Sequence, residues 1–146
     1  MNNKGFTLVE LLASLTILAI ISILMTTSVQ YSVTNVKTKN YETLKKMIVE
    51  ATINYINSSN DEYFSLDNIK PENVECNEFT DCQKEFTIAD ILDKNIYYTN
   101  EKDKDGNLTL ISPKDNEDMR NKIIIIYYDK SEYAIKGMFK EDYKGE

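Results

Sequence analysis

Hydrophobic residues are concentrated at the start of the chain. From Leu8 to Met25 the sequence is almost continuously apolar, which approaches the ~20 residues that a helix needs to cross the hydrocarbon core of a membrane. One carboxylate, Glu10, interrupts this run. A charged side chain in hydrocarbon carries a substantial free-energy cost, so Glu10 points to a function that requires a partner.

A second pattern follows the apolar run, with apolar residues at steps of three and four that predict an amphipathic helix. These residues are Val29, Val33, Val36, Leu44, Ile48, Ala51 and Tyr55. No Gly or Pro occurs between Phe6 and Lys70, so one helix is expected from Phe6 to about Asn57, with a length of roughly 78 Å. We expect residues 29–58 to form an amphipathic helix whose apolar side packs against a globular head.

The rest of the chain, residues 59–146, predicts a small head. Residues 59–86 show no clear period and are expected to form mostly a variable loop. A capping box at Thr87 and Asp90 predicts a short helix that reaches about Asn95. Short β-prone segments then predict an antiparallel meander of three or four strands. These segments are Ile96–Thr99, Leu108–Ile111, Lys122–Tyr128 and Glu132–Phe139. The expected fold class is therefore α+β, a long helix packed on a small antiparallel sheet.

Composition and charge restrict the function. The chain has 146 residues with two Cys, no His and no Trp, which excludes Ser–His and Cys–His catalytic pairs and His-ligated zinc. Residues 1–50 hold five Lys and three Glu, a net charge of +2, and residues 51–146 hold 12 basic and 21 acidic residues, a net charge of −9. The acidic C-terminal part disfavours nucleic acid as a partner.

Two ordinary interpretations of the N-terminus are a signal peptide and a plain membrane anchor. A secretory signal peptide needs a shorter apolar region and a small-residue cleavage site, whereas Met25 is followed by Thr26 and Thr27. A plain single-pass anchor fits the length of the run but gives no reason for Glu10.

A third interpretation accounts for the carboxylate. The segment Lys4–Leu12, KGFTLVELL, resembles the leader junction of type IV pilins and pseudopilins. The resemblance implies a leader at residues 1–5, cleavage between Gly5 and Phe6, and N-methylation of the new N-terminus at Phe6. It also implies that Glu10 of one subunit meets the Phe6 amine of its neighbour, and that residues 6–28 form the transmembrane and filament-core helix.

The same resemblance implies a structural role with no enzymatic activity and no cofactor. The chain would be a subunit of a type IV pilus or of a pseudopilus like that of type II secretion. Its implied partners are other pilin subunits, a prepilin peptidase, and an assembly ATPase with its platform membrane protein. The precursor would sit in the inner or cytoplasmic membrane with its head outside and then move into a surface filament. The alternative is a minor pilin whose head serves as an adhesin or a DNA-uptake binding module.

Three candidate sites lie in the head. Cys76 and Cys82 are separated by five residues and are expected to form a disulfide if the head lies outside the membrane. The segment that carries the oxygen ligands Asp103, Asp105 and Asn107 is similar to the start of a calcium loop.

This segment departs from the EF-hand pattern at its sixth and twelfth positions, which are Leu108 and Lys114, so a hairpin turn is the preferred interpretation. An enzyme tethered by a pilin-like anchor would have to use carboxylates of one solvated loop, and the candidates are Asp115, Glu117 and Asp118.

Overall fold

The computed structural model describes residues 7–70, 75–76 and 82–144, with the backbone alone for residues 26–28. Gly5 and Phe6 lie outside these residues, as do two parts of the predicted variable loop. The chain divides into two compact units, Met1–Lys39 and Asn40–Glu146, which we describe separately.

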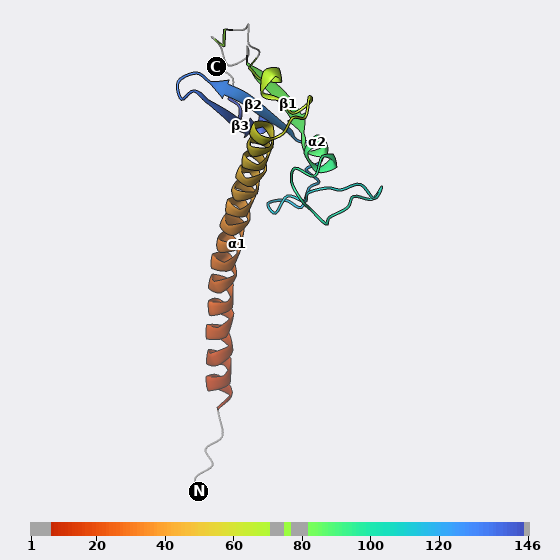
Figure 1. Cartoon of the computed structure of the whole chain (residues 1–146). Coiled ribbons are helices and arrows are strands. Elements are labelled where there is room, and N and C mark those ends of the chain that lie inside the picture. Colours follow the sequence, from red (N-terminus) through yellow and green to blue (C-terminus); the bar gives the residue numbers. More distant parts are fainter. Residues whose placement is uncertain (1–6, 71–74, 77–81, 145–146) are drawn as a thin grey trace. The chain divides into compact units, whose positions relative to one another are not determined.

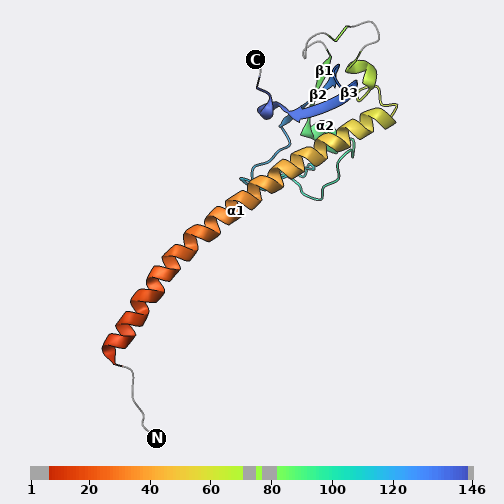
Figure 2. The same cartoon turned by 90° about the vertical axis from the view of Figure 1, so that its left-hand side faces the viewer.

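One helix, α1, runs without interruption over 51 residues from Leu8 to Ser58 (Figure 1). This confirms the long helix that the absence of Gly and Pro predicts. Thr7 caps its first turn, and Ser58 closes its last turn by donating from its hydroxyl to the carbonyl of Asn54 at 2.7 Å. The same helix therefore supplies all the secondary structure described in the first unit and one layer of the second (Figure 2).

In the second unit, α1 contributes one buried face to the core of the head. Tyr41, Ile48, Thr52 and Ile56 are buried, at steps that repeat about once per helical turn. Val29, Val33 and Val36 belong to the first unit, where they are exposed. The expectation that the stripe packs on the head from residue 29 onwards stays a prediction for these three valines.

The head contains a three-stranded antiparallel sheet, whose strands are β1 (Gln83–Thr87), β2 (Ile123–Asp129) and β3 (Ala134–Phe139). The order is β1-β2-β3, with β2 in the centre (Figure 1). Ile124 faces Phe86 on one side and Phe139 on the other, and these three side chains are buried in the core. The four-residue turn after Asp129 confirms the predicted C-terminal hairpin.

Gly137 of β3 lies where side chains of β2 and α1 leave little room for a Cβ atom. A Cβ atom at this position would lie 2.5 Å from Cδ1 of Ile126 and 2.9 Å from Cγ1 of Val49. Only a residue without a side chain fits between β2 and the helix here.

The connection from β1 to β2 begins with a short helix, α2 (Ile88–Asp93), which confirms the predicted capping box. Thr87 accepts from the backbone N–H of Asp90 at 3.1 Å, and the Asp90 carboxylate accepts from the N–H of Thr87 at 2.9 Å. Two single-turn 3₁₀ helices, η1 (Leu66–Asn68) and η2 (Lys140–Asp142), complete the described secondary structure.

Two predicted strands are wrong. Ile96–Thr99 forms no strand, because Ile96 donates its N–H to the carbonyl of Ile91 and so closes the end of α2. Leu108–Ile111 makes only isolated bridges, in which Leu108 faces Lys102 and Ile111 faces Asp118.

The strand that replaces them is β1, which falls at the end of the segment expected to be a loop. It is held by Phe86, whose ring stacks on Phe64 with centroids 4.4 Å apart. The sheet is antiparallel throughout and its strands lie in sequence order, as in the predicted meander. Residues 88–122 make its first connection a long segment instead of a hairpin.

Candidate functional site

Glu10 lies in the first turn of α1 and forms a capping box with Thr7. The backbone N–H and the hydroxyl of Thr7 each donate to Oε2 of Glu10 at 2.9 Å. The N–H of Glu10 donates back to Oγ1 of Thr7 at 3.3 Å. This reciprocal pair satisfies two of the backbone donors that the start of a helix leaves open.

The capping box corrects one step of the sequence argument. A plain anchor does have a reason to keep Glu10, because the carboxylate stabilises the start of its own helix. The Thr-x-x-Glu signature before an apolar run was readable from the sequence and was missed. Glu10 therefore has an intramolecular role whether or not it also meets another subunit.

The apolar part of α1 exposes its side chains on all sides within the first unit. Leu8 is 78% exposed, and Ile17 and Leu24 are each more than half exposed. Among the described residues, α1 is the one helix long and apolar enough to cross a membrane.

Polar side chains in this segment are bonded to the helix itself. The hydroxyls of Ser14, Thr16 and Ser22 each donate to a carbonyl one turn earlier at 2.8 Å. Such bonds let a hydroxyl side chain enter hydrocarbon with its donor satisfied.

Within the head, α1 also has an outward face that lies away from the core. Met47 is 51% exposed and lies about 100–180° round the helix from the buried Tyr41, Ile48, Thr52 and Ile56. We call Asn40, Thr43, Met47, Ala51, Asn54 and Ser58 the outward stripe. None of its members is charged. In the sequence, the same steps of three and four lead back to Val36, Val33 and Val29.

The head contains the predicted disulfide between Cys76 and Cys82, whose Cα atoms lie 5.4 Å apart. Cys82 is buried and directly precedes β1, so the bridge ties the segment before β1 to the edge of the sheet.

The candidate calcium ligands form a turn held by its own donors. Oδ1 of Asp103 accepts from the backbone N–H groups of Asp105 and Asn107, each at 2.9 Å, and the amide of Asn107 donates to Oδ2 at 3.1 Å. The hydrogen bond from the Asn107 side chain is the main cause that holds the pKa of Asp103 below its usual value. Gly106 supplies the positive φ, at 86°, that the turn requires.

This geometry favours the hairpin-turn interpretation over a calcium loop. Among the described residues, no group of three or more His, Cys, Asp or Glu side chains is arranged to hold a metal ion.

The carboxylates considered for a tethered enzyme are also turn residues. Asp115 accepts from the N–H of Glu117 at 3.2 Å, and Asp118 accepts from the hydroxyl of Thr109 and from the N–H of Arg120. All three are exposed, and each described bond of Asp115 and Asp118 stabilises the local chain. Their geometry supports a structural role.

Comparison with known proteins gives one match. Residues 1–26 match the family described as the prokaryotic N-terminal methylation motif. No curated protein and no solved structure matches the chain. The motif covers Gly5, Phe6 and Glu10, while nothing in these comparisons bears on the head.

Proposed function

We propose, from the premise that this chain is a type IV pilin-like prepilin, that it is a structural subunit of a type IV pilus or of a type II secretion-like pseudopilus. The proposal is carried by the methylation motif at residues 1–26, which overlaps the start of the 51-residue helix α1. In this account prepilin peptidase removes residues 1–5 and methylates Phe6. The mature chain then leaves the membrane for the filament.

The site of the cut explains why the anchor is retained. Cleavage between Gly5 and Phe6 removes the leader but leaves the whole of α1 attached to the head. The mature subunit therefore stays in the membrane until the assembly ATPase and its platform protein extract it. The apolar helix and the prepilin motif fit this membrane-anchored stage.

Glu10 is proposed to act both within its subunit and between subunits. Its Oε2 atom caps α1 through Thr7, and no described residue donates a hydrogen bond to Oε1. Cleavage creates an α-amino cation at Phe6, which could bind Oε1 of a neighbouring copy. Before assembly, neither the Glu10 carboxylate nor the Phe6 amine has an opposite charge beside it in the hydrocarbon. Each gains one in the filament, which favours the addition of a new subunit in the correct register.

The outward stripe supports assembly through helix packing. One face of α1 is occupied by the head of the same subunit, and the opposite face offers small, apolar or uncharged side chains to another helix. A helix surface without charges can approach another helix without leaving buried ions unpaired.

The test is the intact mass and the N-terminal sequence of the protein from native membranes, for the wild type and for Gly5→Ala. The wild type is expected to start at methylated Phe6, and Gly5→Ala is expected to remain at full length. A wild-type chain that still starts at Met1, or that is cut beyond Met25, would overturn the proposal.

A second candidate function, a minor pilin with a binding head, is favoured by Tyr133. This residue is 82% exposed at the tip of the β2–β3 hairpin and has a φ of 53°, a conformation that bulky residues rarely adopt. Exposed tyrosines on rigid supports are frequent contact residues. Loss of surface adhesion in Tyr133→Ala filaments of normal length would support this function, and unchanged adhesion would count against it.

A further inference from the structure

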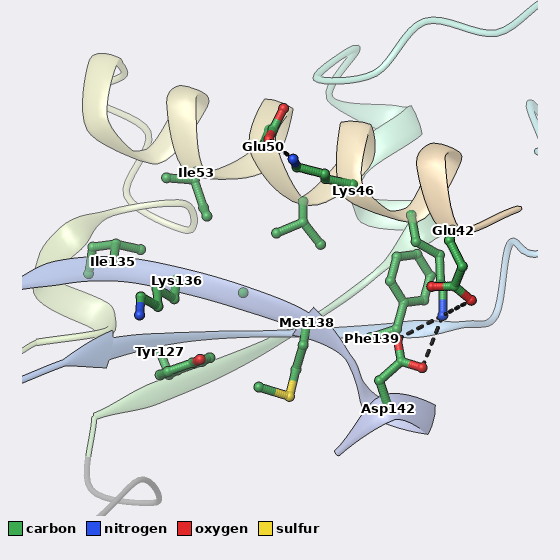
Figure 3. Close-up of a pocket in the computed structure, with 13 residues that line it drawn as sticks. Glu42, Lys46, Glu50, Ile53, Tyr127, Ile135, Lys136, Met138, Phe139 and Asp142 are labelled. Carbon is green, nitrogen blue, oxygen red and sulfur yellow. Dashed lines mark hydrogen bonds and ion pairs between the residues drawn. The ribbon is translucent and has the colours of Figure 1, made fainter. Parts of the chain in front are cut away.

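A groove runs along the edge of the head between α1 and β3 (Figure 3). It has a volume of about 400 Å³. One wall is the side of α1 that carries Lys46, Val49, Glu50 and Ile53, and the other is β3, an edge strand paired on one side with β2. The groove is therefore a surface of the second unit alone.

The floor of the groove is apolar and its margins are charged. The apolar lining includes Val49 and Ile53 of α1 and Ile135 and Phe139 of β3. Lys46 and Glu50 lie along the helix margin (Figure 3). Lys46 and Glu50 are both exposed, and their charged atoms lie 3.7 Å apart. A helix with an apolar face and polar flanks suits a groove of this kind.

Carboxylates cluster at both ends of the groove. At one end Lys45 contacts Glu42, Glu141 and Asp142, and Glu141 also binds Lys122, so three carboxylates meet two ammonium groups.

At the other end Lys136 binds both Asp129 and Glu132, at 2.7 and 2.6 Å. Two carboxylates meet one ammonium group here. Both ends belong to a unit whose net charge is −9, from 14 basic and 23 acidic residues in 40–146.

A matching surface occurs on the stalk segment, which we define as residues 29–39 of α1. Val29, Val33 and Val36 stand at positions i, i+4 and i+7, all at least 48% exposed. The segment contains no Asp or Glu, and its two basic residues, Lys37 and Lys39, lie C-terminal to the valines. The segment is about 15 Å long, close to the roughly 17 Å that six-residue β3 spans.

We infer that the groove of one subunit binds the stalk segment of a second copy of this chain, with the three valines on the apolar floor and the lysines at a carboxylate-rich end. This inference rests on the proposed filament function and names a contact within it. The two surfaces differ, so each copy can bind one neighbour through its groove and another through its stalk. Such a heterologous contact builds an open polymer rather than a closed dimer.

Paired cysteines test the contact in the full-length protein in filaments. The variant Val33→Cys/Glu50→Cys places one thiol on the valine face of the stalk segment and one on the helix margin of the groove. The matched control is Tyr31→Cys/Glu50→Cys, because Tyr31 is also exposed but lies about 160° round the helix from Val33. Both variants retain the Cys76–Cys82 pair.

After mild oxidation, the Val33 variant is expected to give a ladder of cross-linked multimers on a non-reducing gel, at least about tenfold more than the control. Lys37→Glu in the same background is expected to lower the yield about threefold, while Lys37→Arg retains it.

The outcomes separate this inference from the proposed function. Wild-type filaments together with no ladder, or with equal ladders in both variants, would overturn the groove contact and leave the filament function standing. Cross-linking of Val33→Cys to a different protein would overturn it as well. A wild-type chain that is unprocessed and forms no filaments would overturn the proposed function, and the inference with it.

Discussion

At the residue scale, the Glu10 carboxylate has one observed role, as the cap of its own helix, and one proposed role between subunits. The capping box stabilises the first turn of α1 in the isolated subunit, which makes the start of the helix ready for assembly before any partner is present. The proposed contact with a neighbouring Phe6 amine would then use a helix end that is already formed.

Thr7→Ala is expected to loosen this turn, because it removes the acceptor for the N–H of Glu10 and a donor to its carboxylate. Loss of such a cap costs about 1 kcal/mol, so amide hydrogen exchange at Glu10 and Leu11, whose N–H groups bond to Thr7, should become about fivefold faster in detergent micelles. Thr7→Ser keeps the hydroxyl and should exchange like the wild type. Equal exchange in all three proteins would show that the cap does not form.

Tyr133 offers a second test at this scale. Its φ of 53° is strained for a residue with a side chain, so Tyr133→Gly is expected to raise the free energy of unfolding of the head by about 1 kcal/mol. Thermal unfolding measures the change. Tyr98→Gly is the control, because Tyr98 is also exposed but has no positive φ. A destabilised Tyr133→Gly would contradict the strain.

Glu141 makes the head sensitive to acid. Burial raises the pKa of its carboxyl, but the hydrogen bonds from Lys122 and Tyr41 outweigh burial and hold the pKa below its usual value of 4.5. A lowered folded-state pKa gives stability that is present above pH 4.5 and is lost as the pH falls through the lower value. The cluster also contains Lys45 and Asp142.

Glu141→Gln is therefore expected to lower the melting temperature at pH 7 and to flatten its decline below pH 4.5. Circular dichroism melts between pH 7 and pH 3 measure both effects. The control is Glu62→Gln, at an exposed carboxylate outside the cluster. An unchanged acid limb in Glu141→Gln would show that this carboxylate does not control the transition.

At the element scale, α1 has two faces within the head. Its buried face includes Ile48 and Thr52, and its outward stripe is proposed to contact other copies. The sequence pattern alone does not separate these faces, because Val29, Val33 and Val36 share the three- and four-residue spacing of core positions.

Met47→Glu places a charge in the middle of the outward stripe. We expect normal processing at Gly5 and a normal melting temperature, but loss of filaments, because helix packing would bury an unpaired carboxylate. Asn57→Glu, also on an exposed part of α1 but outside the stripe, should still assemble. Sheared filament yield is the measurement, and equal yields would contradict packing through the stripe.

Local signals decided which elements of the head could be predicted. The Thr87–Asp90 capping box and the β2–β3 hairpin are encoded within a few residues, and both are confirmed. Strand β1 depends on distant partners, namely β2 and the ring of Phe64, so its own sequence gives little sign of it.

The same reasoning explains why β-prone residues did not form a strand at Ile96–Thr99. Ile96 contacts the head core, and its N–H bonds to the end of α2, so tertiary packing overrides the local preference for a strand. The roles of Gly5, Phe6 and Glu10 stay predictions, and all three residues lie within the matched motif at residues 1–26.

At the scale of the whole molecule, the chain combines an exposed apolar helix with a separately folded acidic head. The disulfide and the sheet complete the core of the head, whereas the described side chains of residues 8–40 are exposed in the isolated subunit. Large exposed apolar surfaces of this kind are usually covered by lipid or by other protein chains. In the proposed pathway, lipid covers this helix while the subunit is in the membrane, and other subunits cover it in the filament.

The most direct test is the composition of filaments sheared from the cell surface, for the wild type and for Glu10→Ala. The account predicts that wild-type filaments contain this chain with methylated Phe6 as its first residue. It also predicts that Glu10→Ala is cleaved normally but is absent from the filament fraction. A chain that is found only in membranes, with its leader still attached and no filament containing it, would contradict the account.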